Sequence, residues 1–95
     1  MTKSEVLEQI KTALGNIPSQ LDKTIELYME ETINYMLSAG VPEELFIKDK
    51  IDPICVGCII RGVADLWNYG NGDTQLSEYF KSRVFQLTCK GVKNG

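Results

Sequence analysis

The segment from Pro53 to Tyr69 constrains the fold of this chain more than any other stretch. At about 100° per residue, its large apolar side chains cover one broad arc of a helix. They are Val56, Ile59, Ile60, Val63, Leu66 and Trp67. Small residues widen this arc, namely Cys55, Cys58 and Gly62. The remaining polar strip is narrow and consists of Arg61, Asp65 and Asn68. Such a helix is surrounded on most sides, so it forms the centre of the domain or lies between subunits.

Two further helices are predicted before this segment. Two pairs of residues have the spacing of helix caps: Thr2 with Glu5, and Ser19 with Asp22. The first pair begins a helix over about residues 3–14, and the second begins a longer helix that runs to about Ser38. Glycine and proline after Ser38 then stop the pattern.

The second half of the chain has its own start signals. Asp52 before Pro53 begins the apolar helix, because a carboxylate caps free amides and proline is tolerated at the first helical position. Upstream of this cap, helix-start and loop signals are mixed, and we expect one short helical turn around residues 43–48. A last helix is predicted over about residues 75–89, with an apolar stripe that includes Phe80.

These elements predict an all-α fold, a small bundle of four main helices. A chain of 95 residues makes one domain with a thin core. We expect residues 1–89 to form the helical domain and residues 90–95 a flexible C-terminal tail.

Composition argues against several classes of function. The formal charge of −3, without a cluster of lysine or arginine, disfavours specific nucleic-acid binding. The longest apolar run is far shorter than the roughly 20 residues that a membrane span needs. The N-terminus has no signal-peptide pattern, so we expect a soluble cytosolic protein without membrane association. An odd number of cysteines, 3, in such a chain predicts reduced thiols.

The residues do not assemble a catalytic, metal or cofactor site. Cys55 and Cys58 resemble a redox or zinc motif, but the chain has no histidine, and no strand precedes the pair. We expect both to pack in the core. Solvation best explains the acidic residues Glu26, Glu30, Glu31, Glu43 and Glu44. Residues 70–72 form a turn without the lysine of a phosphate loop. We therefore expect no enzyme activity, no metal and no cofactor.

Aromatic residues supply the candidate interface. Packing between helices is the expected role for the group that brackets the turn, Trp67, Tyr69, Tyr79 and Phe80. Phe85 differs, because it lies about half a turn away from the apolar stripe of its helix, and two readings stay open: incidental exposure or an oligomer contact. The candidate interface residues are Phe85, Cys58, Gly62 and Tyr69.

Short motifs spread over most of the chain carry a family resemblance. They are the opening Val6-Leu7-xx-Ile10-Lys11-xx-Leu14, Asp22 with the long helix to Gly40, Asp65-Leu66-Trp67-Asn68-Tyr69, Gly70-Asn71-Gly72-Asp73, Ser77-xx-Phe80 or Tyr79, and Gln86-Leu87. In this order the chain resembles the small head-tail connector proteins of tailed bacteriophages and prophages, which are also described as DNA packaging proteins. Cys55 with Cys58 and the short polar tail depart from that family.

The resemblance implies a structural role in virion assembly. Connector proteins form a homo-oligomeric ring below the portal protein, extend the DNA channel and meet a stopper or tail-completion protein. The implied location is the bacterial cytoplasm during assembly and then the virion neck, with DNA passing through the ring. A competing class is a small helical adaptor or regulator that binds one protein partner as a monomer or dimer. A third class, a cysteine-dependent redox or metal protein, depends on Cys55 and Cys58 alone.

Overall fold

The fold is a bundle of four α-helices. The computed structural model describes residues 1–47, 50–68 and 76–93 of the chain. Its helices are α1 (Lys3–Leu14), α2 (Asp22–Ser38), α3 (Pro53–Asn68) and α4 (Glu78–Lys93), with the 3-10 turns η1 (Ser19–Leu21) and η2 (Glu43–Phe46). Within these residues the only strand-like pairing is an isolated bridge between Thr2 and Lys50. The predicted all-α class, the four main helices and the short turn near residue 43 are confirmed.

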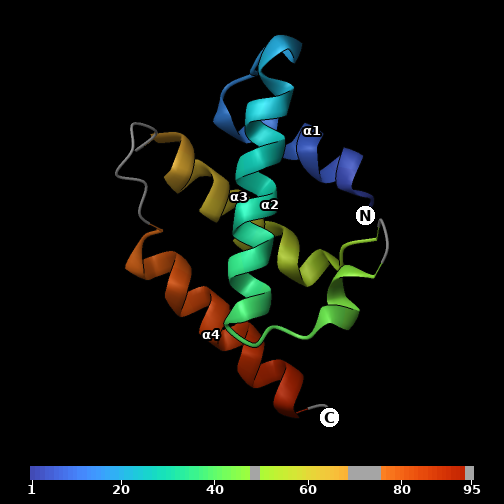
Figure 1. Cartoon of the computed structure of the whole chain (residues 1–95), viewed down its shortest axis with the longest axis vertical. Coiled ribbons are helices and arrows are strands. Elements are labelled where there is room, and N and C mark those ends of the chain that lie inside the picture. Colours follow the sequence, from blue (N-terminus) through green and yellow to red (C-terminus); the bar gives the residue numbers. More distant parts are fainter. Residues whose placement is uncertain (48–49, 69–75, 94–95) are drawn as a thin grey trace.

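Helix α3 lies at the centre of the domain. It packs against α1, α2 and α4. In Figure 1, α2 crosses in front of α3, α4 lies below α3, and α1 lies above it. Most of the apolar arc of α3 is therefore buried within one chain, with Ile60 and Trp67 partly exposed, so the helix takes the central position of the two that the sequence allowed. Within the described residues, we find no helix with both the length and the apolar character to cross a bilayer.

The core combines apolar residues of all four helices. Its fully buried members include Val6, Ile10, Ile25, Met36, Ile59, Val63, Leu66, Phe80 and Val84. The loop before α3 adds Ile51, which is also buried.

At Gly62, two other helices lie close to the backbone of α3. A Cβ atom at this position would lie 2.5 Å from Thr32 Cγ2 of α2 and 2.7 Å from Phe80 Cε1 of α4. Distances of this size are shorter than van der Waals contact, so a side chain at residue 62 would displace one of its neighbours. The expectation that Gly62 lets another helix come close is confirmed.

Most of the predicted helix starts are present. The Thr2 side chain accepts from the Glu5 backbone N–H, and the Glu5 carboxylate accepts from the Thr2 N–H, so the capping box is complete. At the start of α3, the Asp52 carboxylate accepts a 3.0 Å hydrogen bond from the Ile54 N–H.

The predicted cap formed by Ser19 with Asp22 is wrong. Residues Ser19–Leu21 instead form a 3-10 turn that leads into α2, and no side chain caps that helix. Asp22 forms an ion pair with Lys11 of α1, at 2.8 Å. Lys11 is nearly buried, so its ammonium group needs a nearby carboxylate, and Asp22 provides it.

Helix α4 differs from its predicted bounds at both ends. It begins at Glu78 rather than near residue 75, because the Ser77 hydroxyl accepts from the Phe80 N–H at 3.1 Å and caps it. It continues to Lys93, through residues expected to follow its end. One glycine in a helix costs only about 1 kcal/mol relative to alanine, so Gly91 weakens this helix without ending it. The mobility of residues 90–95 stays a prediction.

Candidate protein-interaction surface

Phe85 is exposed on the outer side of α4. Its side chain is 67% exposed, whereas Phe80, Val84 and Leu87 of the same helix are buried. Its helical neighbour Ser82 is also exposed. Phe85 therefore takes no part in the core of the subunit, and its predicted position off the buried stripe is confirmed.

Two other candidate interface residues lie inside the subunit. Cys58 is fully buried, and Gly62 is enclosed by α2 and α4. Neither residue reaches a surface on which a partner could bind, so their assignment to an interface is wrong. The reason is that α3 completes its burial within one chain, using the small residues for contacts between its own helices. Tyr69 lies outside the described residues.

The cysteines of α3 are packing residues, as predicted. Cys55 and Cys58 are free thiols, and both are fully buried. Burial, with a smaller contribution from Asp52 and Cys58, raises the pKa of Cys55 to about 12, and burial raises the pKa of Cys58 to about 11. Both thiols are therefore protonated at neutral pH, which is unfavourable for a nucleophile or a metal ligand. The described residues contain no group of three His, Cys, Asp or Glu side chains placed to hold a metal ion.

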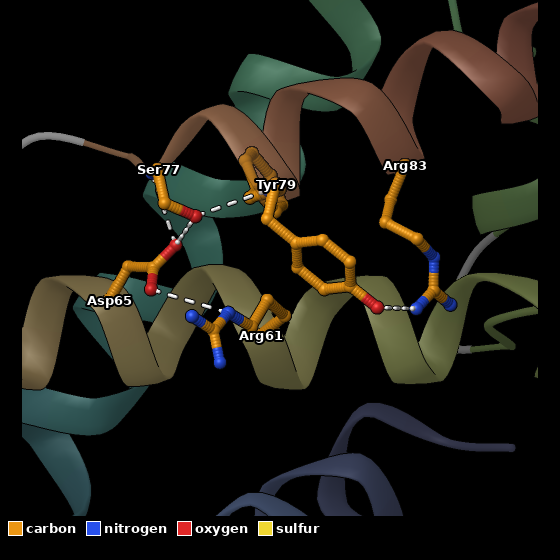
Figure 2. A network of polar contacts seen from close by, with 6 residues as sticks. Arg61, Asp65, Ser77, Tyr79 and Arg83 are labelled. Atoms are coloured by element: carbon orange, nitrogen blue, oxygen red, sulfur yellow. Dashed lines mark hydrogen bonds and ion pairs between the residues drawn. The ribbon is translucent and has the colours of Figure 1, made fainter.

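A buried carboxylate joins α3 to the start of α4. Asp65 is only 3% exposed, although the sequence placed it in the polar strip of α3. Its Oδ2 accepts hydrogen bonds from the Ser77 hydroxyl at 2.6 Å and from the Ser77 N–H at 3.1 Å. Its Oδ1 lies 3.4 Å from Nε of Arg61 (Figure 2). The sequence contains no local signal for this network, because residues 65 and 77 are 12 positions apart in the chain.

Tyr79 lies beside this network with an arginine on each side. The Arg61 Cζ is 5.4 Å from the centre of the Tyr79 ring, and the Arg83 Cζ is 5.9 Å from it. Arg83 Nη1 also donates to the Tyr79 hydroxyl at 3.3 Å, as Figure 2 shows. Tyr79 is 56% exposed, so the expectation that it packs in the core is wrong, although its ring does lie between α4 and Arg61 of α3. We call Arg61, Tyr79 and Arg83 the Tyr79 clamp.

The outer face of α2 exposes a second large apolar residue. Leu27 is 69% exposed and lies among the exposed glutamates Glu26, Glu30 and Glu31. Glu30 forms an ion pair with Lys3 of α1 at 3.1 Å. We call Glu26, Leu27, Glu30 and Glu31 the α2 acidic face.

A shallow hollow beside the N-terminus has a mainly apolar lining. Its lining includes Met1, Leu45, Ile47 and Ile51. The ionisable side chains at its edge are exposed to solvent, namely Glu44, Lys50 and Asp52. Open apolar hollows with solvated edges lack the enclosed polar groups that position a substrate.

Comparison of the chain with family models, curated proteins and solved structures found no match.

Proposed function

We propose that this chain is a structural subunit of a head-tail connector ring of a tailed phage or prophage. In this role it docks below the portal protein, extends the DNA channel and presents a surface to a stopper or tail-completion protein. Support comes from the resemblance of its motifs to that family and from an all-α bundle with the helix order that the motifs imply. The subunit is a structural protein of virion assembly rather than an enzyme.

The observation that carries the proposal is the exposure of Phe85. A phenylalanine that is 67% exposed leaves apolar surface in water without contributing to the core. Aromatic residues are enriched at protein interfaces, where burial of such a side chain favours association. A contact between different faces of identical subunits closes into a ring when the rotation permits, as a channel requires.

The apolar arc of helix α3 does not provide the surface for self-association. From the sequence alone, this arc is expected to be too broad for one chain to bury, so that a second copy would cover part of it. Most of that arc is covered by α1, α2 and α4 of the same chain, so association depends on residues at the surface. This closed core also favours the competing function, a small adaptor that binds one protein as a monomer or dimer.

Replacing Phe85 by serine tests the proposal against the adaptor. We expect F85S to keep the helix content and the thermal unfolding of the subunit, because the side chain makes no core contact. We expect the same variant to assemble less well with purified portal protein. Native mass spectrometry measures the mass of the assembly. Ile47→Ser serves as the matched control, since Ile47 is also exposed, at 55%, but belongs to the loop after η2 rather than to α4.

The I47S control and the binding of the wild-type chain to portal protein distinguish the connector function from the adaptor function. Equal loss of assembly in F85S and I47S would contradict a specific contact at Phe85. A wild-type chain that stays monomeric, alone and with portal protein, would contradict the connector and favour the adaptor.

A further inference from the structure

The Tyr79 clamp is organised before any partner binds. Arg61 and Arg83 approach the Tyr79 ring from α3 and α4, at 5.4 and 5.9 Å from its centre. The hydrogen bond from Arg83 to the Tyr79 hydroxyl further limits the positions of that guanidinium. Side chains held in this way lose less conformational entropy when they bind a ligand than free arginines do. The Tyr79 ring remains 56% exposed between them.

Arg83 supplies the positive charge of the clamp that no carboxylate of the described residues neutralises. Arg61 is already paired with the carboxylate of Asp65, at 3.4 Å. Among the described residues Arg83 forms no ion pair. A guanidinium binds a carboxylate with more than one parallel hydrogen bond, and Arg83 has donors left for this. The chemistry of the clamp thus fits an acidic side chain beside an apolar one.

The α2 acidic face has the complementary composition. Leu27 is its exposed apolar centre, with Glu31 one helical turn further along α2. Glu30 is paired with Lys3, whereas Glu26 and Glu31 form no ion pair among the described residues. In a chain of net charge −3, this face supplies the acidic and apolar groups that the clamp lacks.

The two surfaces lie on different sides of the subunit. Ile25, Met29 and Thr32 bury the inner side of α2, so Leu27 points away from the core. In Figure 2, α2 passes behind α3 and α4, while the clamp lies in front of them. One molecule cannot bring these surfaces together by itself, but successive copies can do so in a head-to-tail arrangement.

We propose that the Tyr79 clamp of one copy binds the α2 acidic face of the next copy. Glu31 and Glu26 approach the guanidinium groups, and Leu27 covers the Tyr79 ring. The inference rests on the proposed function, since it specifies a contact between neighbouring subunits of the ring.

Charge reversal tests this contact. We expect Arg83→Glu and Glu31→Arg each to weaken self-association by about tenfold or more, as is typical when a close charge pair is opposed. The double variant R83E/E31R restores opposite charges across the contact, so we expect it to recover most of the wild-type association. Sedimentation velocity over a concentration series measures both effects, and added salt should weaken the wild-type contact.

The control is Lys81→Glu, which makes the same charge change at an exposed residue of α4 outside the clamp. Circular dichroism checks that each variant is folded. The inference would be overturned if K81E and R83E weakened self-association equally. It would also be overturned if R83E/E31R self-associated no more strongly than either single variant.

The outcomes also separate this contact from the connector role. If the wild type assembles with portal protein and R83E assembles equally well, the proposed contact between the Tyr79 clamp and the α2 acidic face is contradicted. The connector function is then still supported. If R83E/E31R recovers self-association but the wild type does not bind portal protein, the proposed contact is supported and the connector function is contradicted.

Discussion

The hydroxyl of Ser77 donates a 2.6 Å hydrogen bond to Oδ2 of Asp65, and the same hydroxyl accepts from the Phe80 N–H that begins α4. One side chain thus caps α4 and attaches it to the buried side of α3. Because Asp65 is 3% exposed, its carboxylate depends on Ser77 and Arg61 in place of water.

Removal of this carboxylate should destabilise the subunit. We expect Asp65→Ala to lower the free energy of unfolding by about 2 to 4 kcal/mol, because it leaves Ser77 unpaired and removes a buried charge partner of Arg61. Ser77→Ala should cost less, about 1 kcal/mol, mainly through loss of the helix cap. Urea unfolding measures both, with the exposed Asn68→Ala as control. A D65A variant as stable as N68A would show that the network has no role in stability.

Two glycines of α3 should respond to alanine in opposite directions. At Gly62 the added Cβ would meet Thr32 Cγ2 at 2.5 Å and Phe80 Cε1 at 2.7 Å, so we expect a loss of about 1 to 3 kcal/mol. At exposed Gly57 its nearest neighbour is the flexible end of Arg83, at 3.5 Å. Gly57→Ala should therefore stabilise the helix by up to about 1 kcal/mol. Thermal unfolding compares the two, and similar effects of both substitutions would contradict the close packing at Gly62.

The buried thiols should make the fold less stable at alkaline pH. The pKa values of Cys55 and Cys58 in the folded chain are about 12 and about 11, above the value of about 8.5 for an unfolded cysteine. Between these values the folded state binds more protons than the unfolded state, so stability falls as pH rises. The double variant C55A/C58A should lose this contribution, and its unfolding free energy should fall less steeply above pH 9, roughly where unfolded cysteine ionises. If the unfolding free energy of the variant and of the wild type fell with pH at the same slope, the expected contribution of the buried thiols would be contradicted.

Thiol accessibility gives an independent check on the same residues. Cys89 is exposed, whereas Cys55 and Cys58 are buried. A thiol reagent should modify Cys89 rapidly in the native protein and the other two only when the chain unfolds. Fast modification of more than one thiol under native conditions would show that α3 is less enclosed than described.

The sequence predicts those features that depend on neighbouring residues. The capping box of Thr2 with Glu5 and the cap at Asp52 are local patterns, and both form as expected. The apolar arc of α3 likewise predicts that this helix is covered on several sides, although the sequence left open whether the same chain or a second one covers it.

Features that depend on two distant segments could not be predicted in the same way. Asp22 follows a helix-start pattern but binds Lys11 of another helix. Asp65 reads as part of a polar strip, and only the approach of Ser77 makes its burial favourable. Tyr79 is a different case, because the local rotation of about 100° per residue from the buried Phe80 already carries its ring to the surface.

The most direct test of the connector proposal is the mass of the assembly that the wild-type chain forms with purified portal protein. Native mass spectrometry, supported by electron microscopy, would measure it. We expect one closed ring of several copies bound to the portal, and a smaller or absent ring for F85S. A mixture in which the chain remains monomeric and the portal carries no added mass would contradict the proposal.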